Sequence, residues 1–334
     1  MRVSRSLAAL AALVLVTAAC GDFSDPSSPR PRLRVVNPSM SVKVGDEAAT
    51  YSPQLDQIRQ QILAAGISNL ELASAEISVA ADSAGWQGAT TLIANNRTHT
   101  LSSAFVPSDP RRGGGADITY LVDQSDEFAK SGPGTVFDLT SAQLEPAIDA
   151  SMATWQNQPS CGAPRVTKVA DTGADPDLID GFIPTFNPSL IGTPFADITH
   201  AGWLPRPFFD ALAPNGSRFI LGVTFTFIFT ENGVPTDIDH DGRADAAFRE
   251  IYYNQRFFWM TQPTVPARVD VQSVATHEAG HAFGLGHFGK VFIDNRGILQ
   301  FAPRAVMTAV YVSPFRDLTG TDNASFCQLW ANAH

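Results

Sequence analysis

The sequence HEAGHAFGLGH, residues 277–287, carries the strongest pattern in this chain of 334 residues. It contains three of the chain's seven histidines. Four residues turn an α-helix through about 400°, so His277 and His281 share one helix face, one turn apart. The stretch therefore predicts a helix that directs two imidazoles toward the same point.

Two imidazoles in this arrangement can bind one Zn²⁺ at about 2.0–2.1 Å each. Gly284 can adopt the positive φ that ends a helix, after which the chain turns back and His287 becomes the third ligand. Three protein ligands leave a fourth position for water, which is typical of a catalytic zinc site. Glu278 is then placed to act as the general base that takes a proton from this water. The alternative is a buried helix whose histidines are incidental.

The chain around this stretch predicts an α+β fold with a mixed twisted sheet. Asp270 is the expected N-cap of the histidine-bearing helix, which should span residues 271–283. An earlier helix should begin near Glu145, because Pro146 is unfavourable deep inside a helix. A last helix is expected over residues 322–331. Strands are expected at residues 117–122, 166–169, 196–199, 219–230 and 250–253.

Residues 33–110 predict a separate, small α+β or β-rich region of unknown role, for which a prodomain is one candidate. Ser52-Pro53 marks the start of a helix, and residues 70–79 alternate in part, as a strand would. Residues 90–94 and 98–105 are predicted to form a hairpin. The stretch SDPRRGGG, residues 108–115, is the expected linker to a second domain over residues 115–334.

The N-terminus predicts an export signal. Arg2 and Arg5 precede an apolar run over residues 7–16, and the small residues TAA and then Cys20 follow. This order is typical of a secretory signal peptide over residues 1–19. A cysteine at this point resembles a bacterial lipobox, so we expect Cys20 to be lipidated and residues 20–32 to act as a tether. The alternative is an ordinary signal peptide with an incidental cysteine, which would give a secreted protein.

The composition narrows the class of protein. Apolar residues make up 44% and charged residues 17%, which excludes disorder throughout the chain. The net charge of −10, with no block of basic residues, makes nucleic acid an unfavourable partner. The apolar runs are shorter than 18 residues, so we expect membrane contact through the lipid alone.

An acidic loop follows the turn signal Asn232-Gly233. Asp237, Asp239, Asp241 and Asp245 stand at positions 1, 3, 5 and 9 around a glycine at position 6. This is the start of an EF-hand-type loop, so these carboxylates are a candidate calcium site. Position 12 should be Glu but is Phe248, and the loop joins two expected strands rather than two helices. The alternative is a solvated aspartate-rich turn.

The histidine motif resembles that of the metzincin metalloproteases, and it is most similar to the matrixin branch in a bacterial secreted form. Downstream, AVMTAVY over residues 305–311 resembles the Met-turn of this family. The resemblance implies that Met307 lies beneath the zinc site and that Tyr311 lines the substrate pocket. A plain core methionine is the alternative for Met307. The resemblance covers residues 115–334 and implies an opening strand, a helix ending at Trp155, a mixed sheet, the zinc helix and a closing helix.

The cysteines depart from the family pattern. Matrixin zymogens carry a prosegment cysteine that occupies the open zinc position, but Cys161 follows the first helix of the expected catalytic domain. Any inhibition by residues 33–110 must therefore use another group. If Cys20 is lipidated, Cys161 and Cys327 remain, and an oxidising compartment favours a disulfide between them.

Together these features predict a secreted or surface-anchored zinc metalloendopeptidase that hydrolyses protein or peptide substrates. One alternative is a non-catalytic, surface-binding lipoprotein on a metzincin-like fold. Intact Glu278, Gly284 and three histidines argue against that alternative, because binding alone does not need them together. A second alternative is a peptidase that processes a single partner.

Overall fold

The computed structural model describes residues 53–81, 100–123, 139–158, 162–182, 192, 194–263, 268–293 and 299–330, and the backbone of three short strands before residue 94. The chain divides into two compact units, Met1–Pro31 and Arg32–His334. The predicted signal peptide, the tether and Cys20 lie outside the described residues. All that follows concerns the second unit.

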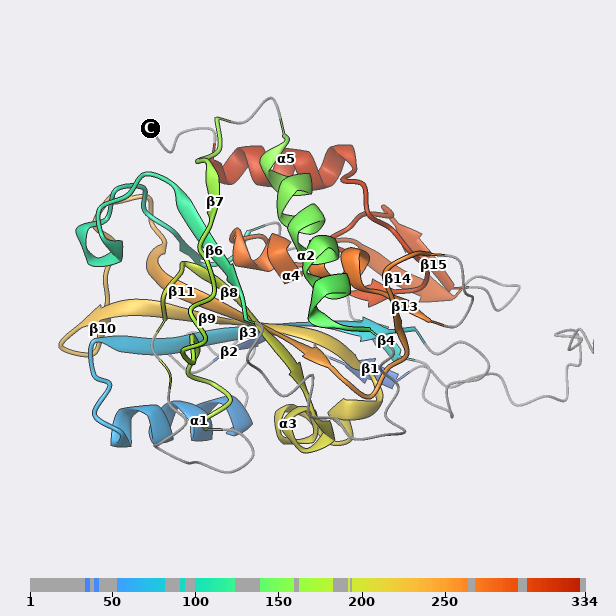
Figure 1. The fold of residues 1–334 in the computed structure, drawn as a ribbon, viewed down its shortest axis with the longest axis horizontal. Coiled ribbons are helices and arrows are strands. Elements are labelled where there is room, and N and C mark those ends of the chain that lie inside the picture. The colour runs from blue at the N-terminus through green and yellow to red at the C-terminus, as the bar shows by residue number, and fades with distance from the viewer. Residues whose placement is uncertain are drawn as a thin grey trace, which may run out of the picture. The chain divides into compact units, whose positions relative to one another are not determined.

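A mixed sheet forms the centre of this unit, in the order β16-β3-β9-β11-β8-β6-β7 (Figure 1). Parallel pairs join β11 to β8, β8 to β6 and β6 to β7, whereas β9 is antiparallel to both of its neighbours. The strands are β3 (Leu70–Ala80), β6 (Ile118–Val122), β7 (Val166–Lys168), β8 (Ile198–Leu204), β9 (Ile220–Glu231), β11 (Ala244–Asn254) and β16 (Val310–Tyr311). The predicted α+β class with a mixed sheet is confirmed at this level.

Helices cover both faces of the sheet (Figure 1). One apolar cluster packs α2 (Ser141–Gln156), α4 (Val271–Ala282) and α5 (Gly320–Trp330) together. The other cluster packs α1 (Pro53–Ala64) and α3 (Arg206–Leu212) against the opposite face. The central strands β9 and β11 are buried on both faces, which explains the nearly continuous run of apolar and β-branched residues in β9. The buried charged residues of β11, Asp245, Arg249 and Glu250, depend on polar partners instead.

Short strands complete the described fold. At the end of β9, Asn232 and Gly233 adopt positive φ angles of 54° and 76° and lead into β10 (Val234–Pro235), as their turn signal predicts. β2 (Ser39–Ser41) pairs with β3. β12 (Trp259–Met260) pairs in parallel with β13 (Val269–Asp270). β14 (Lys290–Ile293) pairs antiparallel with β15 (Leu299–Ala302). Among the described residues, every helix is too short or too polar to cross a bilayer.

The start of α2 differs from the prediction. The helix begins at Ser141 rather than near Glu145, because Gln143 Oε1 accepts the N–H of Thr140 at 2.9 Å and completes a capping box. Pro146 is the sixth helical residue and therefore removes only one intrahelical hydrogen bond. The cap thus outweighs the proline in setting the boundary.

The predicted hairpin within residues 90–105 is wrong. β4 (Thr91–Ile93) pairs in parallel with β1 (Arg34–Val36), and β5 (Ser103–Ala104) pairs in parallel with β11. Alternation identified extended segments correctly, but it carries no information about which strands become neighbours.

Residues 33–110 do not form a domain separate from residues 115–334. β3 lies inside the main sheet, between β9 and β16. The expected linker is a short 3-10 turn, Pro110–Arg112, in which Arg111 pairs with Asp109 at 2.7 Å. Arg112 is nearly buried and lies 3.2 Å from Asp197. Arg111 also pairs with Asp245 of β11 at 2.7 Å. The pairs with Asp245 and Asp197 join the segment to the part of the chain that follows it.

Candidate metal centre

The histidine-bearing helix α4 is buried along its whole length between the sheet and α2. Asp270 caps it by accepting the N–H of Ser273 at 3.0 Å. Arg316 donates to the same carboxylate at 2.9 Å, and Trp155 of α2 donates its indole N–H to the carbonyl of Thr276 at 2.8 Å. The helix is thus anchored at its start and along its side, which restricts movement of the side chains that it presents.

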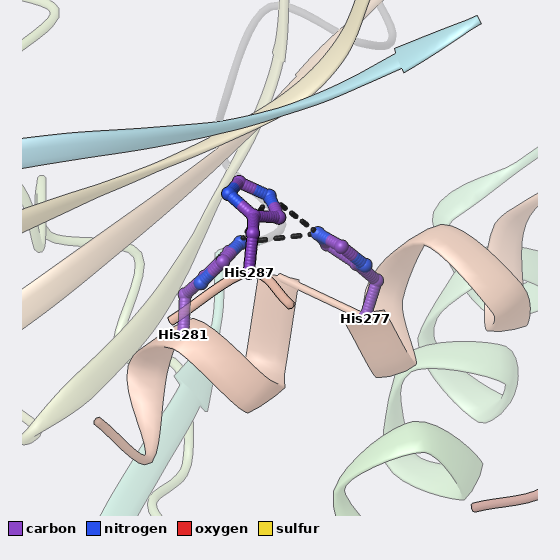
Figure 2. A group of neighbouring side chains, drawn as sticks. All are labelled: His277, His281 and His287. Atoms are coloured by element: carbon purple, nitrogen blue, oxygen red, sulfur yellow. Dashed lines mark hydrogen bonds between the residues drawn. The ribbon is translucent and has the colours of Figure 1, made fainter. Parts of the chain in front are cut away.

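The three predicted histidines come together at one point (Figure 2). The Nε2 atoms of His277 and His281 are 3.0 Å apart, those of His281 and His287 are 3.0 Å apart, and those of His277 and His287 are 3.2 Å apart. Three nitrogens bound tetrahedrally at about 2.0–2.1 Å to one ion would lie about 3.3 Å apart. The triad is therefore a buried group that could hold a metal ion.

Hydrogen bonds on the other side of two rings assign their tautomers. His277 Nδ1 donates to the carbonyl of Val306 at 2.6 Å, and His281 Nδ1 donates to the carbonyl of Leu285 at 2.8 Å. A carbonyl oxygen can only accept, so the Nε2 atoms of these neutral rings carry lone pairs. Lone pairs that face one another at 3.0 Å repel, and a cation between them removes this repulsion.

Burial keeps all three imidazoles neutral. It lowers the pKa of His277 to about 4 and the pKa values of His281 and His287 well below the usual range. The mutual proximity of the rings lowers the pKa values of His281 and His287 further. A neutral imidazole is the form that binds a metal, so the electrostatics of the site agree with its geometry.

Glu76 of β3 is a site residue that the sequence did not reveal. Its Oε2 lies 3.2 Å from Nδ1 of His287, at ion-pair distance but without the alignment of a hydrogen bond. A carboxylate this close favours a proton on Nδ1 and leaves Nε2 free for a metal. Residues 70–79 alternate as a strand should, but nothing local indicates that this strand crosses the histidines.

Glu278 is buried, and its carboxylate is held by two hydroxyls from the sheet. Ser78 of β3 donates to Oε1 at 2.5 Å, and Thr224 of β9 donates to Oε2 at 2.7 Å. Gly222 makes this possible, because a Cβ there would lie 2.8 Å from Oε1. Burial raises the pKa of Glu278 to about 7, although both hydroxyls oppose this shift. The carboxylate therefore changes protonation near neutral pH.

The end of α4 is shaped by Gly284 and by a second residue that the sequence did not reveal. Gly284 has a φ of 96°, in the region that favours glycine, and the chain turns there toward His287. Arg249 of β11 donates to the carbonyls of His281 and Ala282 at 2.8 Å each. A buried cation at a helix C-terminus satisfies carbonyls that the helix itself leaves unpaired.

Met307 packs directly against α4. A Cβ on Gly280 would overlap the Met307 sulfur and would lie 2.8 Å from Cζ2 of Trp155. The turn that carries Met307 is held by Asp322 of α5, which accepts the N–H groups of Val306 and Met307 at 3.0 Å each. Because Val306 also accepts the proton of His277 Nδ1, Asp322 helps to position a histidine of the triad.

Tyr311 lines a cavity beside the triad. The same cavity is lined by His277, Ser78, Phe315 and Arg304. The hydroxyl of Tyr311 accepts the N–H of Asp270 at 3.0 Å, and burial raises its pKa to about 12. Tyr311 is therefore a protonated wall residue at neutral pH, whereas its contact with a substrate stays a prediction.

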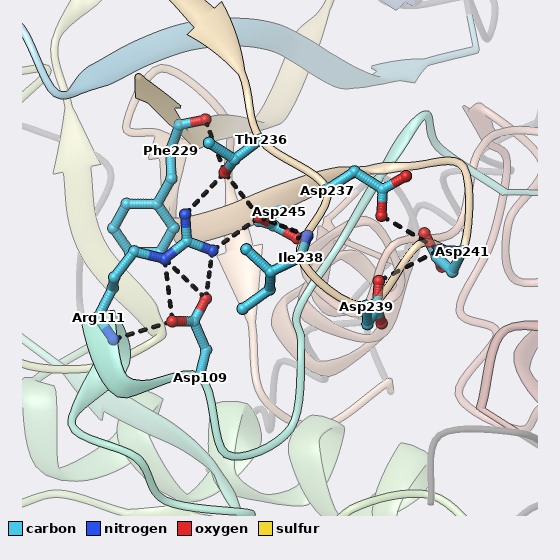
Figure 3. A network of polar contacts seen from close by, with 9 residues as sticks. All are labelled: Asp109, Arg111, Phe229, Thr236, Asp237, Ile238, Asp239, Asp241 and Asp245. Atoms are coloured by element: carbon cyan, nitrogen blue, oxygen red, sulfur yellow. Dashed lines mark hydrogen bonds and ion pairs between the residues drawn. The ribbon is translucent and has the colours of Figure 1, made fainter. Parts of the chain in front are cut away.

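The structure brings three of the four loop aspartates together. Carboxylate oxygens of Asp237, Asp239 and Asp245 lie within 4.8 Å of one another. Asp241 instead pairs with Arg243 at 2.9 Å. Asp245 pairs with Arg111 at 2.7 Å (Figure 3). Burial and the neighbouring carboxylates raise the pKa of Asp239. The calcium site stays a prediction. A Ca²⁺ ion in this loop would compete with two guanidinium groups for the aspartate carboxylates.

A second group of carboxylates lies in the loop after β7, which contacts strand β11. Oxygens of Asp175, Asp177 and Asp180 lie within 4.8 Å of one another. Fully buried Glu250 accepts the N–H groups of Leu178 and Ile179 at 2.8 and 3.1 Å. Burial raises the pKa of Glu250 to about 8. This carboxylate therefore ties the loop to the sheet.

Cys327 of α5 is disulfide-bonded. The other two cysteines, Cys20 and Cys161, lie outside the described residues. The pairing of Cys161 with Cys327 therefore stays a prediction.

Comparison with known proteins does not assign the chain to a family. No protein-family model matches it, and no curated protein is similar enough to count as a relative.

Proposed function

We propose that this protein is a zinc-dependent metalloendopeptidase of the matrixin-like metzincin type. The observation that carries the proposal is the triad, in which imidazole lone pairs converge within 3.0–3.2 Å in a buried site. An all-imidazole donor set with three ligands suits zinc and leaves a position for water. The order β6, α2 ending near Trp155, α4, the Met307 turn and α5 supports the family resemblance.

Zinc held by His277, His281 and His287 would supply Lewis acidity toward a peptide carbonyl and lower the pKa of a bound water. Glu278 accepts a proton and returns it to the leaving amine. In the metal-free protein burial raises the pKa of Glu278 to about 7, and a cation bound nearby would lower it toward the ionised form that accepts a proton. Ser78 and Thr224 fix the orientation of this carboxylate, and Glu76 orients the ring of His287.

A non-catalytic binding protein is the second candidate, and one observation favours it. His277, His281 and His287 are only 5%, 0% and 1% exposed, and Glu278 is fully buried. A peptide cannot reach a site that is closed in this way without a rearrangement. If the site never opens, a bound metal would only stabilise the fold, and the function of the protein would be to bind a partner at its surface.

The proposal extends to the location of the protein. The N-terminal pattern around Cys20 supports export and a lipid anchor in the bacterial cell envelope, with protein or peptide as substrate. Nucleic acid is not an expected partner of a chain with a net charge of −10.

Two substitutions test the catalytic assignment. Glu278→Gln keeps a side chain of the same shape and all three histidines, so one zinc per chain should remain. Peptide cleavage should fall by about 10²–10⁴-fold, the usual contribution of a positioned proton acceptor. His281→Ala should lose both zinc and activity.

The measurements are elemental analysis for zinc and cleavage of a broad peptide library, with and without a chelator. Glu231→Gln, at an exposed position on β9, is the matched control and should match the wild type in both. A Glu278→Gln protein that cleaves as fast as wild type would refute the base assignment. A wild-type protein that takes up no zinc would refute the enzyme class.

A further inference from the structure

The cavity beside the triad connects His277 with the surface of the protein. Its inner wall is formed by buried residues, among them His277, Val274 and Val306. Its outer wall includes Arg304 and Ser313, which are exposed. Arg304 lies between the end of β15 and the turn that carries Met307. A group that enters from solvent therefore passes Arg304 before it reaches the imidazole of His277.

Two contacts hold the charged end of Arg304 at the cavity. Its guanidinium carbon lies 4.5 Å from the centroid of the Phe315 ring, and its Nη2 donates to Oγ of Ser313 at 3.2 Å. Phe315 and Ser313 both line the cavity, so the guanidinium is part of the same wall. A guanidinium has five N–H donors, and the hydrogen bond to Ser313 leaves the others available to a ligand.

The positive charge of Arg304 is not neutralised by a carboxylate of the described residues. Its contacts are those with Phe315 and Ser313, and the described lining of the cavity includes no aspartate or glutamate. The neighbouring carboxylate of Asp270 is already engaged, because Arg316 donates to it at 2.9 Å and it caps α4. The cavity thus presents a cation to whatever enters it.

A second polar group lies deeper in the same cavity. Thr308 is 7% exposed and lines the cavity. Its Oγ1 is buried and makes no hydrogen bond to any residue in the described part of the chain. A buried hydroxyl without a partner costs free energy, so a polar group that reaches it is bound more favourably than an apolar one. Val274, Val306 and Val310 make the remaining wall apolar, which suits a ligand with a short apolar stem and a polar end.

We propose that this cavity binds a carboxylate of the peptide substrate and that Arg304 makes the protein selective for acidic peptides. The inference rests on the proposed peptidase function and adds the class of substrate. The carboxylate is either that of a Glu or Asp side chain or the free C-terminus of a peptide, since both form the same charge-assisted hydrogen bonds with a guanidinium. The net charge of −10 by itself favours basic peptides, so a preference for acidic peptides requires a local cation such as Arg304.

The test measures peptide binding separately from cleavage. Full-length Glu278→Gln protein, in which cleavage is slowed, is titrated with Ala/Gly hexapeptides that are blocked at both ends and carry one Glu at each position in turn. Matched sets carry Gln or Lys instead, and a further Gln set has a free C-terminal carboxylate. At one position, or with the free C-terminus, the carboxylate peptide should bind about fivefold more tightly than its blocked Gln counterpart. The exposure of Arg304 limits the effect to this size, and added salt should reduce it.

Variants in the same background assign the effect to this cavity. Arg304→Gln should abolish the difference between carboxylate and Gln peptides, and Arg304→Glu should bind the Lys peptides more tightly than the Glu peptides. Arg206→Gln removes an exposed arginine of α3, on the other face of the sheet, and should keep the original preference. Thr308→Val removes a hydroxyl that has no described partner, so it should weaken binding of the carboxylate peptides without lowering the melting temperature.

Equal affinity for the Glu, Gln and free-carboxylate sets would overturn the proposal, and so would a preference that survives Arg304→Gln or the absence of any binding. A preference for Glu at one position identifies a side chain as the ligand, whereas a preference for the free-carboxylate set alone identifies the peptide C-terminus. Cleavage of the peptide library by wild type separates the two proposals. If wild type cleaves without an acidic preference, the peptidase proposal stands and the role of Arg304 fails. If binding depends on Arg304 as expected but wild type cleaves no peptide, the cavity binds carboxylates and the peptidase proposal fails instead.

Discussion

Replacing Gly280 with alanine should destabilise the protein, although alanine is the better helix former. Gly280 lies in α4 between His277 and His281 of the triad. A Cβ there would overlap the Met307 sulfur and would lie 2.8 Å from Cζ2 of Trp155. Both of these side chains are fully buried, so neither can move into solvent to make room.

Two opposing effects decide the sign. Alanine in a helix interior is more favourable than glycine by about 1 kcal/mol. Overpacking a well-packed core costs about 1–3 kcal/mol, and the upper end applies because both neighbours are enclosed. The net result should be a loss of about 1–2 kcal/mol in the free energy of unfolding.

Urea unfolding measures this change. Gly320→Ala is the matched control, because a Cβ at the first residue of α5 meets nothing within 4 Å. Its free energy of unfolding should be unchanged or slightly higher. Met307→Ala alone should cost about 2–5 kcal/mol. The double variant should lose less than the sum of the two single losses, since the shorter side chain removes the overlap. A Gly280→Ala protein as stable as wild type would refute the packing argument.

Four further predictions concern other parts of the chain. Burial raises the pKa of Glu250 to about 8 from an ordinary value of 4.5, so the folded protein holds a proton that the unfolded chain releases. The free energy of unfolding of wild type, relative to Glu250→Gln, should therefore fall as pH rises from about 5 to 8, and a constant difference would contradict this. Added Ca²⁺ should raise the melting temperature of metal-stripped wild type, and also of the surface control Asp317→Asn. It should not raise the melting temperature of Asp239→Ala. An equal rise in all three proteins would favour a solvated turn. Acyl-probe labelling should mark wild type and spare Cys20→Ser, and mass mapping should find Cys161 linked to Cys327 rather than as a free thiol.

The features that could be predicted from sequence are those set by local chemistry. The helix α4 begins at the Asp270 cap and ends before the positive φ of Gly284, as its residues indicate. The turn at Asn232-Gly233 is also set by neighbouring residues. The spacing of His277 and His281 places both imidazoles on one face of any helix that forms there. These properties depend on a few adjacent residues, so they can be read without knowledge of the fold.

The structure differs from the sequence-based prediction where two local signals compete and where strands adjacent in sequence do not pair. Pro146 suggested a later start for α2 than the capping box at Thr140 and Gln143 allows. The segments around residues 91–93 and 103–104 are extended, but each pairs with a strand other than its neighbour in sequence. Alternation defines the faces of a strand and not its partner.

The surroundings of the triad depend on contacts between residues far apart in the chain. Ser78 and Glu278 are 200 residues apart, yet they share a hydrogen bond because β3 pairs with β9 above α4. Asp322 and Arg249 likewise hold the Met307 turn and the end of α4 from other elements. The shared helix face of His277 and His281 could be predicted from spacing alone, since helix geometry is a local property. The groups that orient, bury and cover them were not, because a buried polar side chain finds its partner only after strand order and helix packing have brought the two together.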